Sequence, residues 1–351
     1  MDLLGLSVRW PIVGAPMAGG PSTPALAAAV SGAGGLGFLA AGYLTAQSLE
    51  HDISEVRRLG EPAFGVNVFV PGSPEVDEVA LHAYLDSLRP EAEAFGVDLV
   101  ASWDDDQWND KLELLTQDPV PVVSFTFGAP TPEVVSRLQR AGSKVVITVT
   151  TPAEAAQAAD VGADAVCAQG IEAGGHQGSF SDASMPDTGW GLLALVTAIG
   201  HEVQIPIIAA GGVMTGSGVA AVLRAGAVAA QVGTALLRSP ECGASEVYKG
   251  AFTDPAFSET AITRAFSGRR ARGLRNAFMR AHSDAPSAYP HINNATRALR
   301  RAAVARHDPN AINLWAGQGF RLAQPRAAAD VITTLGDELE SSGIFNPSTP
   351  H

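Results

Sequence analysis

The chain has 351 residues, of which 46% are hydrophobic and 17% are charged, and its formal net charge is −13 at pH 7. This length suits a closed α/β barrel that carries an insertion, and the composition argues against wholesale disorder. The acidic charge argues against nucleic acid as a partner, because phosphate backbones bind clustered cations.

The cysteines and the apolar segments bear on location. Cys167 and Cys242 are too few and too far apart for a disulfide framework or a metal cluster, which favours a reducing compartment. The start, MDLLGLSVRW, has an acid at Asp2 and no base before its apolar stretch, unlike a secretory signal. The most apolar segment, 25–44, is interrupted by glycines, unlike a membrane-spanning helix. We therefore expect a cytoplasmic protein without a membrane segment.

Short apolar runs alternate with helix-like stretches almost from the first residue, and this alternation predicts a parallel sheet. Several of the runs are continuously apolar, as expected for strands buried on both faces. In chain order, the predicted strands are 12–15, 37–41, 64–70, 122–127, 145–149, 165–168, 207–210 and 229–232. The predicted helices are 24–33, 45–59, 75–88, 106–115, 132–141, 152–161, 190–199 and 216–225.

The alternation stops after the eighth strand and resumes only with an amphipathic helix over 326–339. We therefore predict a TIM (β/α)8 barrel made by residues 1–240 and 313–351, with a smaller, mainly helical cap at 241–312. Residues 264–306 hold ten arginines and a single acid, Asp284. These arginines either pair with acids of the barrel or of a second subunit, or form a lid that attracts anions.

The loops that follow the predicted strands are rich in glycine. In a parallel barrel the chemistry lies on these loops, because the carboxyl ends of all strands gather around one mouth. Gly211 and Gly212 follow the seventh strand, and Gly233 and Thr234 follow the eighth. Backbone amides at these two positions can hold a phosphate when no Cβ blocks its approach. We predict a phosphate site there; the alternative is a pair of tight turns, with Thr234 as a helix cap.

Two amide side chains stand in otherwise apolar strands. Asn67 lies inside FGVNVFV, and Gln169 follows the sixth strand. A buried amide must be hydrogen-bonded, so each is either paired within the protein or faces a ligand at the barrel mouth. Two such amides at one rim favour a planar cofactor with a polar edge.

A histidine lies on the loop after the sixth strand, in QGIEAGGHQG. Gly174, Gly175 and Gly178 let this loop pass close to a flat ligand while the imidazole of His176 is held toward it. This setting favours a catalytic role over a structural one. The other seven histidines show no metal-ligand spacing such as HxH or HExxH, so we predict no metal site.

Eight motifs together resemble one known family, the nitronate monooxygenases, formerly called 2-nitropropane dioxygenases. The chain contains, in order, PIVGAPMAGGPSTPALAAAVSGAGGLGFLAAG, FGVNVFVP, VVSFTFG, QGIEAGGHQG, IPIIAAGGV, VGTALL, FSGRRARGLRN and LWAGQG. IPIIAAGGV is shared by many phosphate-binding barrels, whereas VVSFTFG, the GGH loop and WAGQG are specific for this family and its nearest relatives. The resemblance extends from Pro11 to Gly319.

The resemblance implies an FMN-dependent barrel with the flavin lying across the carboxyl rim, and it puts His176 in the place of the family's catalytic histidine. Motif position assigns the isoalloxazine border to Pro16 and Met17, its polar edge to Asn67 and Gln169, backbone contacts to Gly174 and Gly175, the phosphate to Gly211, Gly212, Gly233 and Thr234, and the rest of the pocket to Gly317 and Gln318.

The implied reaction is the oxidation of an alkyl nitronate by O2 to a carbonyl compound and nitrite, without NAD(P)H. If the neutral nitroalkane is also a substrate, His176 would remove its acidic α-proton; otherwise it would bond the nitro oxygens of the anion. Family members line the substrate pocket with several tyrosines, whereas this chain has only four, of which Tyr289 is the best placed. Asn293 and Arg297 stand where more aromatic or lysine character is expected. An anionic substrate such as propionate 3-nitronate would suit the arginine-rich cap.

Two alternatives stay open. The FGVN strand and the GGH loop also resemble the FMN- and NAD(P)H-dependent enoyl-acyl-carrier-protein reductases, which use an acyl-carrier partner. A flavin-binding barrel without turnover is the other alternative. The sequence does not distinguish a monomer from a homodimer.

Overall fold

The computed structural model describes residues 1–61, 63–182 and 189–345 of the chain. Eight parallel strands form one sheet in the order β3-β11-β10-β8-β7-β6-β5-β4. A parallel bridge between Val13 and Leu36 joins the two outer strands, so the sheet curls into a nearly closed barrel. The strands are β3 (Ile12–Gly14), β4 (Gly37–Ala40), β5 (Phe64–Phe69), β6 (Val122–Thr126), β7 (Lys144–Val149), β8 (Ala165–Gln169), β10 (Ile207–Ala210) and β11 (Ala229–Val232). All eight predicted strands and the TIM-like fold are confirmed.

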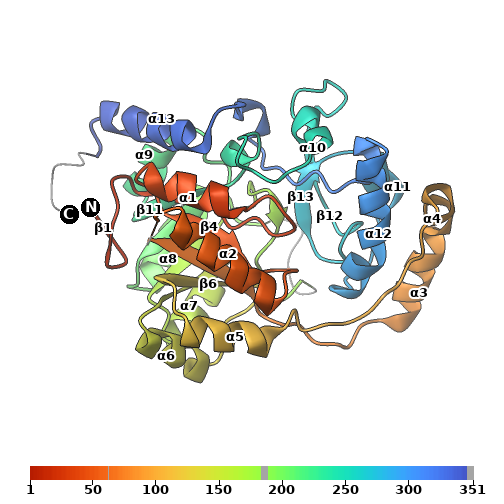
Figure 1. The fold of residues 1–351 in the computed structure, drawn as a ribbon, viewed down its shortest axis with the longest axis horizontal. Helices are drawn as coiled ribbons and strands as arrows, with labels where there is room; N and C mark the ends of the chain where they lie inside the picture. The colour runs from red at the N-terminus through yellow and green to blue at the C-terminus, as the bar shows by residue number, and fades with distance from the viewer. Residues whose placement is uncertain (62, 183–188, 346–351) are drawn as a thin grey trace.

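Helices cover the outside of the barrel (Figure 1). They are α1 (Pro24–Gly32), α2 (Ala46–Arg58), α5 (Trp108–Gln117), α6 (Pro132–Ala141), α7 (Pro152–Asp160), α8 (Leu192–Glu202), α9 (Gly216–Arg224) and the closing α13 (Ala328–Ser341). Threonine hydroxyls begin several of them. Thr23 accepts a hydrogen bond from the amide of Leu26, and Thr151 accepts one from the amide of Glu154. Proline follows each threonine in the first helical turn, where its missing N–H costs nothing.

The strands are buried on both faces. In β6, Val122 belongs to the cluster inside the barrel and Val123 to the cluster under the helices. Ala165 and Val166 of β8 alternate in the same way. This two-sided burial explains why the strands read as continuous apolar runs. Among the described residues, no helix is both long and apolar enough to cross a membrane.

The segment after β11 builds a second layer over the carboxyl ends of the strands (Figure 1). It contains α10 (Glu246–Ala251), β12 (Thr260–Thr263), β13 (Ala271–Leu274), α11 (Ala277–Ala281) and α12 (His291–Ala305). In addition to the predicted helices it holds strands, since β12 and β13 form an antiparallel sheet with the two-residue strand β9 (Gly175–His176). The cap is therefore joined by backbone hydrogen bonding to the loop that carries the histidine.

The connection between β5 and β6 reaches the same layer. Two helices were predicted between residues 73 and 117, and three are present: α3 (Glu78–Ser87), α4 (Arg89–Phe95) and α5. Both α3 and α4 contact α12, and they lie beside the cap helices in Figure 1. Part of the barrel's own chain thus supports the cap.

Candidate active site

A cavity of about 570 Å³ lies at the carboxyl ends of the barrel strands, with walls from both the barrel and the cap segment. This volume falls within the range of about 300–1,000 Å³ that is typical of small-ligand sites. Twelve of the residues assigned from the sequence line it: Pro16, Met17, Asn67, Gln169, Gly174, Gly175, His176, Gly211, Gly212, Gly233, Thr234 and Gly317.

Two assigned residues are placed differently. Gln318 is exposed and lies outside the cavity lining; its backbone N–H donates to the carbonyl of Glu172. Tyr289 is also absent from the lining, but its hydroxyl donates to the hydroxyl of Tyr43, which does line the cavity. Tyr43 is thus the tyrosine that meets the cavity at this corner.

The loops after β10 and β11 offer free backbone donors. Among the described residues, the amides of Gly212 and Gly233 have no hydrogen-bond acceptor. The hydroxyl of Thr234 accepts from the amide of Gly317 at 3.0 Å, which joins the β11 loop to the segment before α13. Unpaired N–H groups on converging loops are donors suited to a phosphate dianion.

The loop before His176 needs glycine for two different reasons. A Cβ at Gly174 would lie 2.5 Å from the backbone nitrogen of Gly317, so only glycine permits this close approach. Gly175 has a φ of +79°, and a Cβ built there would meet nothing within 4 Å. The backbone at Gly175 therefore borders open space, as a cradle for a flat ligand requires.

The amide side chains of Asn67 and Gln169 form hydrogen bonds within the protein, but each keeps one hydrogen-bonding group for a ligand. Nδ2 of Asn67 donates to the hydroxyls of Ser124 at 2.9 Å and Thr126 at 3.0 Å, so its oxygen remains to accept. Nε2 of Gln169 donates to the carbonyl of His176 at 3.0 Å, and its Oε1 accepts from the amide of Gly178 at 2.7 Å. Gln169 thus fixes the histidine loop through two hydrogen bonds and retains one N–H for a ligand.

Aromatic rings surround His176. Its ring centroid lies 5.7 Å from that of Phe127, 5.5 Å from that of Trp315 and 5.9 Å from that of Tyr289. The guanidinium of Arg269 lies 4.1 Å from the centre of the Phe127 ring. Burial, and then the positive charges of Arg269 and Arg300, lower the pKa of His176 to about 3. The imidazole is therefore neutral at physiological pH.

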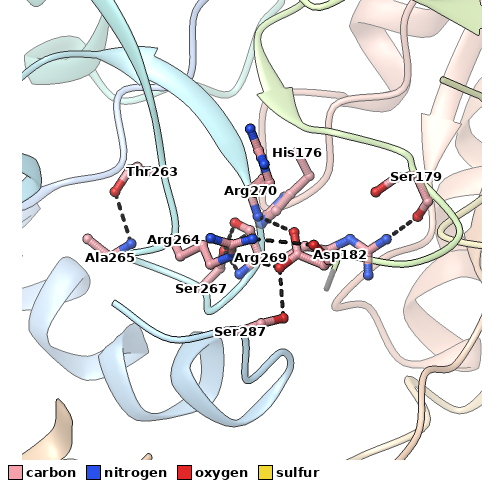
Figure 2. Close-up of polar contacts among 10 residues, drawn as sticks. All are labelled: His176, Ser179, Asp182, Thr263, Arg264, Ala265, Ser267, Arg269, Arg270 and Ser287. Atoms are coloured by element: carbon pink, nitrogen blue, oxygen red, sulfur yellow. Dashed lines mark hydrogen bonds and ion pairs between the residues drawn. The ribbon is translucent and has the colours of Figure 1, made fainter. Parts of the chain in front are cut away.

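A buried carboxylate organises the cap next to this ring (Figure 2). Asp182 accepts hydrogen bonds from Nε of Arg264 at 2.7 Å, from the backbone N–H of Arg270 at 2.9 Å and from the hydroxyl of Ser287 at 2.7 Å. Burial raises the pKa of Asp182, but these hydrogen bonds and the charge of Arg264 outweigh it and bring the pKa below its usual value.

One wall of the cavity is cationic. Arg297, Arg300 and Arg301 of α12 line it, and none of the three forms an ion pair with a carboxylate in the described part of the chain. Burial is the main cause that lowers the pKa of Arg300 to about 10; Tyr43 opposes the shift and the positive charge of Arg297 adds to it. Other cap arginines do pair with acids, as Arg264 does with Asp182. Pairing of cap arginines with acids is therefore present, while the three arginines of the cavity wall have no acidic partner among the described residues.

Five residues at or beside the site were not predicted from the sequence. Phe127, Ser267, Arg269 and Trp315 lie inside motifs quoted for the resemblance, but nothing in the sequence placed their side chains at the site. Tyr43 follows the predicted strand 37–41, and its place on the loop after that strand was the available signal. No group of three or more His, Cys, Asp or Glu side chains is placed to hold a metal ion within residues 1–61, 63–182 and 189–345.

Comparison with known proteins identifies the family. The sequence model described as nitronate monooxygenase matches residues 2–338. A nitronate monooxygenase of Pseudomonas aeruginosa PAO1 is 42% identical over 345 residues, covering 95% of this chain and 97% of that protein. A probable nitronate monooxygenase of Staphylococcus aureus strain Newman is 39% identical over 340 residues, covering 95% of each chain.

Solved structures are similar over the same length. The crystal structure of nitroalkane oxidase from Streptomyces ansochromogenes superposes with a TM-score of 0.93 at 49% identity, covering 96% of this chain and 97% of that one. FabK from Thermotoga maritima superposes with a TM-score of 0.71 at 30% identity, covering 96% and 94%. The barrel, the glycine-lined cavity and these similarities agree: the chain belongs to the nitronate monooxygenase family of flavin-dependent oxidoreductases.

Proposed function

We propose that this enzyme oxidises alkyl nitronates with O2 to a carbonyl compound and nitrite, with FMN bound in the cavity at the barrel rim. The observation that carries the proposal is the position of His176, which lines the cavity among aromatic rings and follows a glycine cradle that has open space beside it, at Gly175. FMN supplies the one-electron redox chemistry that links an electron-rich nitronate to O2.

The residues present fit FMN. The free amides of Gly212 and Gly233, together with Thr234, would hold its phosphate. The remaining acceptor of Asn67 and the remaining donor of Gln169 would face the polar edge of the isoalloxazine. Pro16 and Met17, which also line the cavity, would border the ring, with Gly174 and Gly317 closing the pocket through their backbones.

His176 would act as the base when the substrate is a neutral nitroalkane. The imidazole takes the α-proton, and the electron pair of the broken C–H bond stays on the substrate as the nitronate. The depressed pKa of His176 keeps the imidazole in the form that accepts a proton. The nitronate formed beside it supplies the opposite charge that stabilises the resulting imidazolium.

The cationic wall would select substrates with a second negative charge, such as propionate 3-nitronate. Arg297 and Arg300 lack acidic partners among the described residues, and Tyr43 offers a hydroxyl at the same corner. A hydrogen bond to a charged group contributes about 1.5–3 kcal/mol. We therefore expect Arg300→Met to raise KM for propionate 3-nitronate about 10-fold or more, with little change for ethyl nitronate.

Oxygen uptake and nitrite release test the assignment of the base. We expect His176→Asn to reduce turnover of nitroethane about 100-fold or more while ethyl nitronate is still oxidised, because only the nitroalkane needs a base. His282→Asn is the matched control, since His282 is a cap histidine that bonds Glu91 and does not line the cavity. Equal losses for nitroethane and ethyl nitronate in the His176 variant would defeat the base assignment.

The resemblance of the FGVN strand and the GGH loop keeps a second candidate open, an FMN- and NAD(P)H-dependent enoyl-acyl-carrier-protein reductase. Rapid loss of flavin absorbance on adding NADH without O2, with no response to nitronate, would favour the reductase. FMN binding without turnover of either substrate would leave a non-catalytic flavin-binding barrel.

A further inference from the structure

A buried serine of the cap is the hydrogen-bond partner of the catalytic imidazole. Oγ of Ser267 lies 2.8 Å from Nε2 of His176, and Ser267 is 1% exposed. Among the described residues, this is the one hydrogen bond made by the imidazole ring. The aromatic rings around His176 restrict its position but do not decide which nitrogen carries the proton.

The contacts of Ser267 decide which nitrogen of His176 carries the proton. Its hydroxyl oxygen also lies 3.1 Å from the carbonyl oxygen of Arg269 and 3.3 Å from the amide nitrogen of the same residue. The carbonyl can only accept and the amide can only donate, while the hydroxyl has a single proton. All three contacts are satisfied together when the hydroxyl donates to the carbonyl and Nε2–H of His176 donates to the hydroxyl.

The other tautomer breaks this arrangement. With the proton on Nδ1, the hydroxyl would have to turn to the lone pair on Nε2 of His176, and the carbonyl of Arg269 would lose this donor. Arg269 is buried, so an unpaired carbonyl there is unfavourable.

The position of Ser267 is itself fixed from two directions (Figure 2). Asp182 binds Arg264 and the amide of Arg270, the residues on either side of the turn that carries the serine. Strand β13 then pairs with β9, with Ala271 opposite His176 in the register. The histidine therefore lies on β9 and the serine in the turn that leads into the paired strand β13, which limits their relative movement.

We propose that Ser267 is a positioning residue that holds His176 as the Nε2–H tautomer and so leaves the lone pair on Nδ1 for the α-proton of a nitroalkane. During the step, the C–H bond breaks, an Nδ1–H bond forms, and the electron pair remains on the substrate. The kinetic part rests on the proposed function of His176 as base; the tautomer itself does not.

The tautomer is tested by 15N NMR on protein with labelled histidine, with and without FMN. His176→Asn assigns the signals of His176. We expect the wild type to show the Nε2–H pattern, and Ser267→Ala to show a shift toward a mixture with Nδ1–H. A wild-type spectrum of the Nδ1–H type, or an unchanged spectrum in the alanine variant, would overturn the proposal. The wild-type spectrum decides the matter even if Ser267→Ala fails to fold.

Kinetics then separate positioning from general damage. We expect Ser267→Ala to lower kcat/KM for nitroethane about 10- to 100-fold and to change that for ethyl nitronate by less than about 3-fold. The matched control is Ser143→Ala, which removes a buried barrel hydroxyl that bonds the carbonyl of Val120 and not the imidazole. It should leave both the His176 signals and the ratio of the two activities unchanged; equal losses for both substrates in Ser267→Ala would count against positioning.

The two proposals fail in different ways. An enzyme with the Nε2–H tautomer that oxidises no nitronate would refute the proposed function and leave the role of Ser267 intact. An enzyme that oxidises nitronates but holds His176 as Nδ1–H would do the reverse.

Discussion

Replacing Asp182 with asparagine tests how the cap is held beside the histidine loop. The carboxylate is 7% exposed and has three donors, Arg264, the amide of Arg270 and Ser287. Asparagine retains one acceptor oxygen and presents an NH2 group in place of the other, so at least one donor loses its partner. A bond to a charged acceptor contributes about 1.5–3 kcal/mol, and an unpaired buried donor costs about 1–3 kcal/mol. Because Arg264 is 28% exposed and is partly solvated, we expect a loss of about 3 kcal/mol in the free energy of unfolding.

Differential scanning calorimetry measures this effect. With an unfolding entropy of about 2.1 cal/mol/K per residue, a loss of 3 kcal/mol lowers Tm by about 4 °C in a chain of this length. Asp118→Asn is the matched control, since Asp118 pairs with Arg57 at 2.6 Å on the surface, where such a pair contributes less than about 1 kcal/mol. Equal Tm shifts in the two variants would refute the reasoning.

The effect should also depend on pH. Burial raises the pKa of Asp182, but its hydrogen bonds from Arg270, Arg264 and Ser287 lower it by more. Because the folded pKa lies below the unfolded value of 3.8, the ionised carboxylate stabilises the fold above that value, and this stabilisation is lost as the pH falls through the folded pKa. The Tm difference between wild type and Asp182→Asn should therefore shrink below about pH 4; a difference independent of pH would contradict the assignment.

Three further outcomes follow. The low pKa of His176 predicts that kcat/KM for nitroethane shows no histidine titration between about pH 5 and 8, and an inflection near 6.5 in pH–rate measurements would contradict it. Gly174→Ala puts a methyl group 2.5 Å from the nitrogen of Gly317 and should reduce the FMN retained after dialysis, whereas Gly250→Ala, which meets nothing within 4 Å, should retain it. Lys111→Met removes the buried cation 2.7 Å from Asp106 and should cost about 3 kcal/mol in urea unfolding, with partial recovery when Asp106 is also changed to asparagine.

The barrel could be predicted from the sequence because its local patterns agree with its tertiary environment. Strands such as β6 are buried on both faces and therefore read as short apolar runs, and threonine–proline pairs such as the one at Thr151 mark helix starts. Helix α4 was missed because it is short and directly follows α3, so the two read as one segment. The strands β12 and β13 were missed because they lack the apolar run that marks barrel strands of the same length, such as β10.

The site was predictable only where backbone and strand order determine it. Loops after parallel strands must meet at one rim, so His176 and the glycines could be placed together from the sequence. The contact between His176 and Ser267 spans 91 residues and depends on the pairing of β9 with β13, which no local pattern encodes. Tyr43 lies on the loop after β4 and lines the cavity, whereas the sequence had assigned this place to Tyr289.

Anaerobic mixing of the FMN-loaded enzyme with ethyl nitronate tests the central claim most directly. The proposed function predicts that the nitronate alone changes the visible spectrum of the oxidised flavin, and that O2 then restores that spectrum with release of nitrite. Flavin absorbance that stays unchanged with nitronate, or that responds to NADH alone, would contradict it.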